Sequence, residues 1–151
     1  MSSRAEVFLI DDNPFSLAST KKTVSRVFPP QSIRIFSSAK DALDFLAQDF
    51  SQDDKAKTNN PKARPRKVRP GLILSDLHMP DLDGFGFLDR FSLLPAAVQS
   101  RFSIFILSSV AGNEHIRRLF EKPSFGGFCY KPLTLDKLKH LLIQANLSCC
   151  R

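Results

Sequence analysis

From Gly71 to Leu88 the chain reads G-L-I-L-S-D-L-H-M-P-D-L-D-G-F-G-F-L, and an apolar run within it leads to a single acid, Asp76. A short apolar run bounded by turn signals indicates a buried strand. Pro80 and Gly84 then favour a turn before an aromatic-rich helix. Asp76 is therefore expected where a strand ends, and in open α/β sheets ligands bind at that edge.

Three other apolar runs also end in polar side chains. Residues 7–10 lead to Asp11 and Asp12, residues 104–107 lead to Ser108, and residues 128–130 lead to Lys131, which Pro132 follows. Because the carboxyl ends of parallel strands meet at one edge of a sheet, we expect these side chains to lie close together. Carboxylates, a hydroxyl and an ammonium at one edge predict a site for a metal ion and a phosphoryl group.

The three carboxylates carry the proposed chemistry. At short range Asp11, Asp12 and Asp76 repel one another unless a cation neutralises them, and Mg²⁺ prefers such hard oxygen ligands. Asp76 is the expected nucleophile, since a carboxylate can accept a phosphoryl group as an acyl phosphate. Ordinary explanations stay open: Asp76 can cap a helix, and so can an Asp-Asp pair, although Asn13 can cap that helix alone.

The order of these motifs resembles the receiver domain of bacterial two-component response regulators, of the stand-alone chemotaxis type. The resemblance covers residues 6–146, and its motifs are I-D-D at 10–12, S-D-L-H-M-P-D-L-D-G at 75–84, L-S-S at 107–109 and Y-K-P at 130–132. It implies an α/β, flavodoxin-like (βα)5 three-layer sandwich with a parallel five-stranded sheet in the order 2-1-3-4-5. Strands 1, 3 and 4 would then be neighbours.

The resemblance also implies roles for individual residues. Asp76 would be the phosphoacceptor, with Ser108 and Lys131 contacting the phosphoryl group and Pro132 at the family's cis-proline site. Asp11, Asp12 and Asp76 would hold Mg²⁺ together with the main-chain carbonyl of His78.

Two further roles concern switching and lifetime. Ser108 and Phe128 would form the switch, although a plain core position remains an alternative for Phe128. His78, two residues after Asp76, would tune the lifetime of the phosphoryl group, and it departs from the amide found there in chemotaxis receivers.

The implied function is that of a phosphorelay protein. A histidine kinase or histidine phosphotransfer protein would donate the phosphoryl group in a Mg²⁺-dependent reaction. The acyl phosphate would switch the surface made by helix 4, strand 5 and helix 5, which are expected after Asn113, at 128–130 and after Thr134. With no output domain expected, a downstream effector protein would read the switch. Beyond self-catalysed acceptance and autodephosphorylation, no enzymatic activity is expected.

Periodicity and turn signals predict the individual elements. Strands are expected at 6–10, 32–36, 72–76, 102–107 and 128–130. Helices are expected from Pro14 to Pro29, after Ser38, at 84–93, from Asn113 to Pro123 and after Thr134. We expect a single domain over residues 1–151, with a core at about 5–146.

The charge of the chain is concentrated in one segment. The net charge is +7, and residues 50–70 hold seven basic and two acidic residues, a net of +5. This segment contains three prolines and no apolar period, which indicates a flexible surface loop. Nucleic-acid or anionic-surface binding through Lys55–Arg69 is an alternative, but the loop lacks the interleaved aromatic residues that stack on bases.

Apolar runs and the cysteine count limit which other classes of protein the chain can belong to. No apolar run approaches the ~20 residues of a membrane span, and the N-terminus lacks the apolar region of a secretory signal. With only three cysteines, no disulfide framework is expected, so the sequence favours a cytoplasmic protein. A haloacid-dehalogenase-like phosphatase remains as an enzymatic alternative because Asp81–Gly84 reads D-x-D-G. That signature should directly follow a strand, however, and here three residues intervene.

Overall fold

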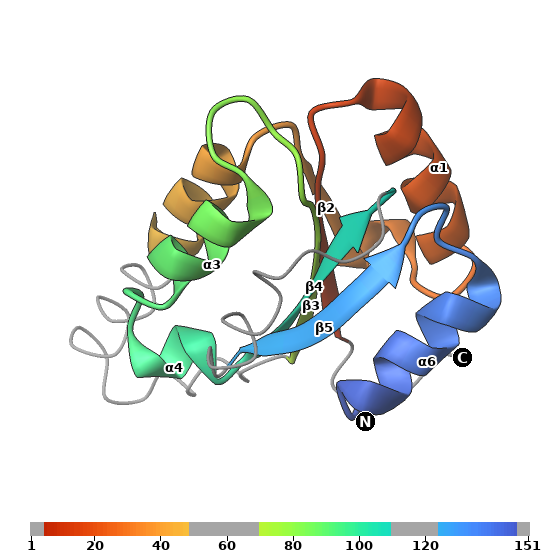
Figure 1. The fold of residues 1–151 in the computed structure, drawn as a ribbon. Coiled ribbons are helices and arrows are strands. Elements are labelled where there is room, and N and C mark those ends of the chain that lie inside the picture. The colour runs from red at the N-terminus through yellow and green to blue at the C-terminus, as the bar shows by residue number, and fades with distance from the viewer. Residues whose placement is uncertain (1–4, 49–69, 110–123, 148–151) are drawn as a thin grey trace.

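The computed structural model describes residues 5–48, 70–109 and 124–147 (Figure 1). The strands are β1 (Glu6–Ile10), β2 (Ile33–Phe36), β3 (Gly71–Asp76), β4 (Phe102–Ser108) and β5 (Phe125–Tyr130). The helices are α1 (Pro14–Val24), α3 (Gly84–Phe91), α4 (Ala96–Gln99) and α6 (Leu135–Gln144), with a 3₁₀ turn at Pro30–Ser32, and residues 39–48 are also helical. None of the described helices is long and apolar enough to cross a membrane.

The five strands form one parallel sheet in the order β2-β1-β3-β4-β5, which confirms the predicted fold class. The register aligns the strand ends, since Ile10 pairs with Ser75 and Asp76 pairs with Leu107. The chain therefore leaves β1, β3 and β4 at one edge of the sheet, where the functional residues were expected.

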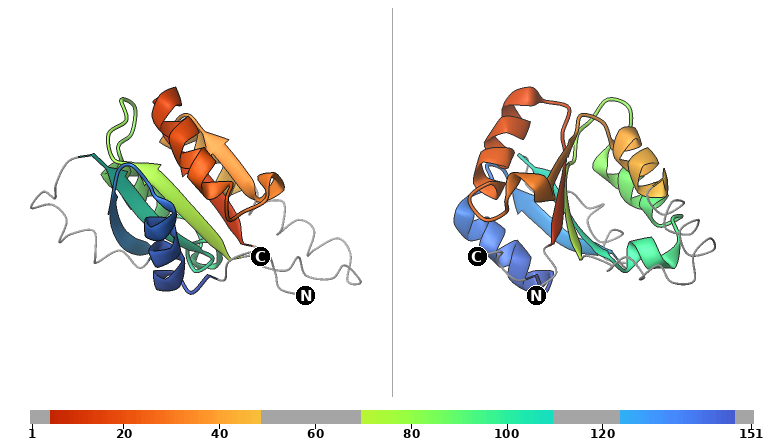
Figure 2. Two further views of the ribbon diagram at one scale, coloured as in Figure 1. Left: turned by 90° about the vertical axis from the view of Figure 1, so that its right-hand side faces the viewer. Right: turned by 180° about the vertical axis from the view of Figure 1, so that it is seen from behind.

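Helices cover both faces of the sheet (Figure 2). Val7 and Leu9 of β1 belong to the apolar core that also contains Val24 and Leu138, from α1 and α6. Phe8 and its face of the sheet pack instead with residues 39–48 and α3. Because both faces of β1, β3 and β4 are buried, these three strands are almost continuously apolar rather than alternating.

Side-chain caps fix where the helices begin. The side chain of Asn13 accepts hydrogen bonds from the N–H groups of Phe15 and Ser16, at 2.9 and 3.2 Å. Ser38 and Thr134 cap the helix at 39–48 and α6 in the same manner. The helix starts expected at Pro14, after Ser38 and after Thr134 are confirmed, and the caps set the position of each helix relative to the sheet edge.

Two helix boundaries differ from the prediction. Helix α1 ends at Val24 rather than at Pro29, because the N–H of Val27 bonds to the carbonyl of Val24 in a tighter turn that brings Val27 and Phe28 into the core. Helix α3 ends at Phe91, and Pro95 precedes the unpredicted helix α4.

Strand β5 begins at Phe125 rather than at Phe128, so Gly126 and Gly127 lie inside it. A side chain at Gly126 would place its Cβ 2.6 Å from the Phe105 ring, and Gly127 has a φ of +144°. Glycine is therefore favoured at both positions, and the sequence predicted only residues 128–130 of this strand because a glycine pair weakens the strand signal. The helix expected at 113–123 and most of the basic loop lie outside the described residues.

Candidate functional site

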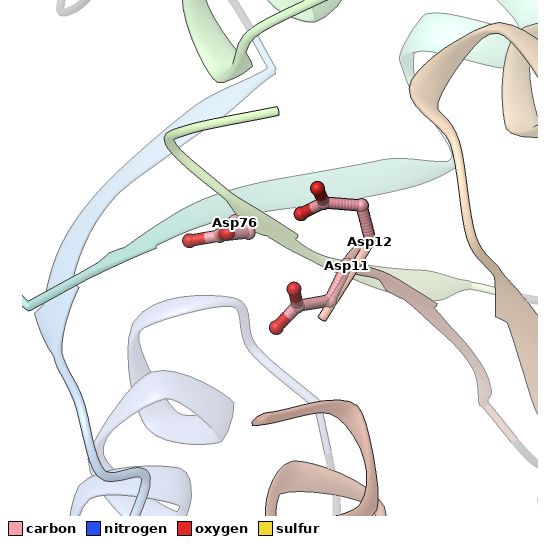
Figure 3. A group of neighbouring side chains, drawn as sticks. All are labelled: Asp11, Asp12 and Asp76. Carbon is pink, nitrogen blue, oxygen red and sulfur yellow. The ribbon is translucent and has the colours of Figure 1, made fainter. Parts of the chain in front are cut away.

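Three carboxylates meet at the edge of the sheet where β1 and β3 end. Asp11 and Asp12 follow β1, Asp76 is the last residue of β3, and oxygen atoms of the three side chains lie within 4.8 Å of one another (Figure 3). Asp11 is buried, Asp76 is half-buried and Asp12 is exposed. Across residues 5–48, 70–109 and 124–147, no other group of three His, Cys, Asp or Glu side chains is arranged in this way.

Lys131 brings a positive charge into this cluster. Its Nζ lies 3.1 Å from Asp11 Oδ2, 3.0 Å from Asp76 Oδ1 and 2.7 Å from Ser16 Oγ. The peptide bond from Lys131 to Pro132 is cis. The ammonium group therefore bridges two of the three acids, Asp11 and Asp76.

Three elements hold the segment that carries Lys131. Its main-chain N–H donates to the carbonyl of Ser108 at 2.8 Å. From α6, Lys137 Nζ donates to the carbonyls of Tyr130 and Pro132, at 3.1 and 3.2 Å. From α1, the Thr23 hydroxyl donates to the carbonyl of Leu133 at 2.9 Å. Strand β4 and helices α1 and α6 thus fix the backbone on both sides of the lysine.

Burial raises the pKa of the Asp76 carboxyl above its ordinary value of 3.8. The hydrogen bond and positive charge of Lys131 act in the opposite direction, and the negative charge of Asp11 adds to the rise. A further cation at the cluster would favour the ionised form of Asp76, which is the form that can act as a nucleophile.

The carboxylates fit a magnesium ion. An octahedral Mg²⁺ with oxygen ligands at about 2.1 Å spaces opposite ligands about 4.2 Å apart. Neighbouring ligands of that octahedron lie about 3.0 Å apart, so the three carboxylate oxygens, all within 4.8 Å of one another, would draw closer around a bound ion. Exposed Asp12 leaves a path from solvent, and a small hard ion suits three carboxylates.

The other predicted site residues differ in burial. Ser108, the last residue of β4, is buried and lies one register position beyond the pair formed by Asp76 and Leu107. His78 is exposed in the turn after β3. Phe128 is half-buried against the core, with its ring 5.3 Å from that of Phe125, so both a core role and a switch role stay open.

Ser16 is a contact of the site that the sequence did not reveal. Its hydroxyl accepts a 2.7 Å hydrogen bond from Lys131. The only signal is a serine in the first turn of the helix that follows Asp11-Asp12, and a serine there is commonly solvent-exposed. The long side chain of Lys131 crosses the sheet edge to make this contact. The spacing of residues in the sequence does not predict it.

The D-x-D-G motif at Asp81–Gly84 serves to start a helix. The side chain of Asp83 accepts a 2.8 Å hydrogen bond from the N–H of Gly86 and caps α3. Asp81 is exposed in the turn between β3 and α3. Because neither acid directly follows a strand, this arrangement lacks the strand-end nucleophile of a haloacid-dehalogenase-like phosphatase.

Comparisons with solved structures agree with the fold. No protein-family model matches the sequence, and no curated protein matches it either. Among solved structures, a response regulator receiver protein from Dyadobacter fermentans is similar with 27% identity and a TM-score of 0.71, covering 95% of this chain and 99% of its own. A two-component response regulator from Cytophaga hutchinsonii gives 19% identity and a TM-score of 0.72, covering 96% and 98%.

A chemotaxis response regulator of Vibrio cholerae is also similar, with 19% identity and a TM-score of 0.61 over 94% of this chain and 98% of that one. The similarity to these structures extends over nearly the whole length of the chain.

Proposed function

We propose that this chain, a response regulator receiver domain, accepts a phosphoryl group on Asp76 from a phosphohistidine. The donor would be a histidine kinase or a histidine phosphotransfer protein. The observation that carries the proposal is the meeting of Asp11, Asp12, Asp76 and Lys131, from three separate segments, at one edge of the sheet.

The chemistry is an in-line transfer with the carboxylate as nucleophile. An Oδ atom of Asp76 attacks phosphorus, the new O–P bond forms, and the P–N bond to the donor imidazole breaks with its electron pair returning to the ring. Lys131 would neutralise charge on one phosphoryl oxygen, and the Ser108 hydroxyl would donate to another. Water later cleaves the acyl phosphate and restores the carboxylate.

A magnesium ion completes the proposed site. Asp11, Asp12 and Asp76 would hold it together with the main-chain carbonyl of His78. When bound, Mg²⁺ supplies positive charge that offsets the repulsion between the carboxylates and the incoming phosphoryl oxygens.

The phosphorylated state would be read through a change of surface. A phosphoryl oxygen on Asp76 offers Ser108 a new acceptor, and a movement of Ser108 opens space toward which the ring of Phe128 can turn. The affected surface includes β5 and α6, where Tyr130 and Ile143 are already exposed. A downstream effector protein would bind one of the two states.

His78 is proposed to set the lifetime of the phosphoryl group, because it lies two residues after Asp76 and is exposed to solvent. His78→Asn should change the decay rate of the adduct while acceptance continues. Equal decay rates in variant and parent would remove this role.

Acetyl phosphate with Mg²⁺ tests the proposed acceptance directly. Intact mass should show one labile phosphoryl adduct, absent without Mg²⁺ and absent in Asp76→Asn. In Lys131→Met the rate should fall by about a hundredfold, since a charge-stabilising donor is lost. Lys139→Met, on the exposed side of α6, is the matched control and should behave like the parent. An adduct that persists in Asp76→Asn would contradict the assignment.

A further inference from the structure

A closed ring of hydrogen bonds links Lys131 to the start of helix α1. Lys131 Nζ donates to Asp11 Oδ2 at 3.1 Å and to Ser16 Oγ at 2.7 Å. The N–H of Ser16 donates to Asn13 Oδ1 at 3.2 Å, and the N–H of Asn13 donates back to Asp11 Oδ1 at 2.9 Å. The ring contains four residues and both carboxylate oxygens of Asp11.

The ring divides the two oxygens of Asp11 between different partners. Oδ1 is held by a main-chain N–H of the helix cap, whereas Oδ2 is held by the lysine. Replacing the Ser16 side chain leaves its N–H and the cap intact, so Asp11 keeps its orientation. Only the ammonium group of Lys131 loses a partner.

An ammonium group has three donors, and the ring occupies two of them. The remaining contact of Lys131 Nζ is Asp76 Oδ1, at 3.0 Å. With Asp11 and Ser16 fixing two directions, the third N–H is aimed at the proposed phosphoacceptor. Without Ser16, the ammonium group could turn toward an open pocket of about 260 Å³ that Ser19, Thr20 and Pro132 also line.

From this arrangement we infer that Ser16 is a positioning residue: its hydroxyl holds Lys131 so that one N–H points at the oxygen of Asp76 where the phosphoryl group arrives. The inference rests on the proposed phosphoryl acceptance and adds a residue to its machinery. It separates two functions within the site, because Asp11 keeps a main-chain donor at Oδ1 whereas the lysine is oriented by a hydroxyl.

The test compares Ser16→Ala with two matched variants in the full chain. Ser16→Thr keeps the hydroxyl, and the adjacent pocket has room for the extra methyl group. Ser19→Ala removes a hydroxyl one turn further along the same helix, where the side chain lines the pocket and is exposed. The rate of adduct formation from acetyl phosphate is measured by intact mass across a Mg²⁺ titration.

Ser16→Ala should lower the rate at saturating Mg²⁺ by about tenfold, the size expected for one hydrogen bond to a charged group. The Mg²⁺ concentration for half-maximal rate should stay within about twofold of the parent, because Asp11 keeps its main-chain donor. Ser16→Thr and Ser19→Ala should match the parent. A rate in Ser16→Ala close to that of the parent overturns the inference, and so does an equal loss in Ser16→Thr.

A second measurement separates this inference from the proposed function. In the metal-free protein, the ¹⁵N–¹H signal of the Lys131 ammonium, assigned by its absence in Lys131→Met, should be observable because its protons are held in hydrogen bonds. Ser16→Ala should broaden or abolish it, and Ser19→Ala should not. If the parent accepts no phosphoryl group, the proposed function fails. An unchanged ammonium signal in Ser16→Ala contradicts the positioning role in either case.

Discussion

Two opposing effects act on the pKa of the Asp76 carboxyl. Half-burial at the end of β3 raises the pKa of its carboxyl, while Lys131 at 3.0 Å favours the ionised form. Because the pKa of Asp76 is above 3.8 in the folded protein, the folded state binds this proton more tightly than the unfolded state does. The protonated Asp76 carboxyl therefore stabilises the folded state at a pH below its pKa in the unfolded chain. This stabilisation is lost as the pH rises through its pKa in the folded protein.

This loss of stability with rising pH gives a prediction for Asp76→Asn, because the asparagine side chain cannot ionise. In metal-free buffer, its melting temperature relative to the parent should increase as pH rises from acid to neutral. Added Mg²⁺ should reduce the difference, because the parent offers the ion three carboxylates and the variant offers only two. Differential scanning calorimetry at several pH values measures both effects. A difference that does not vary with pH would show that the ionised Asp76 carries no folding cost.

At the scale of elements, helix α6 supports the site from outside it. The Thr134 side chain accepts a hydrogen bond from the N–H of Lys137 and caps the helix, and Lys137 in turn holds the carbonyls on either side of Lys131. The cap therefore stabilises the helix that anchors the lysine segment.

Thr134→Ala should lower the free energy of unfolding by about 1 kcal/mol, because one N–H at the start of α6 loses its acceptor. Thr134→Ser keeps the oxygen and should retain most of the stability. Urea denaturation followed by circular dichroism measures both variants. Equal losses in the alanine and serine variants would mean that the methyl group, and not the cap, provides the stability.

Some strand boundaries could be predicted from the sequence and others could not. The ends of β1, β3 and β4 were predictable because apolar runs that lead to Asp11, Asp76 and Ser108 carry their own signal. The start of β5 was not, because Gly126 is required by the Phe105 ring of the neighbouring strand. Sequence spacing does not contain contacts of this kind, and the hydrogen bond from Lys131 to Ser16 is another example.

At the scale of the whole molecule, the parallel sheet brings the negative charges of three carboxylates together at one edge. Cations must neutralise that charge. Within the described part of the chain, Lys131 is the cation that contacts both Asp11 and Asp76. Asp12 is exposed, and its side chain is the cluster's most accessible acid. Ion binding should therefore stabilise the folded state through all three carboxylates.

Mg²⁺ at a hundredfold its dissociation constant should raise the free energy of unfolding by about 2.7 kcal/mol. Asp12→Asn should lose most of this effect, whereas Asp44→Asn, an exposed acid of the helix at 39–48, should keep it. Urea denaturation with and without Mg²⁺ measures the difference. The same response in both variants would place the ion elsewhere.

Phosphoryl transfer to a single carboxylate is tested most directly by locating the adduct. Borohydride reduces an aspartyl phosphate to homoserine, which peptide mass spectrometry can place in the sequence after reaction with acetyl phosphate and Mg²⁺. Reduction should convert residue 76 and no other aspartate. Homoserine at position 11 or 12, or a phosphoryl group on a histidine or serine with residue 76 unchanged, would contradict it.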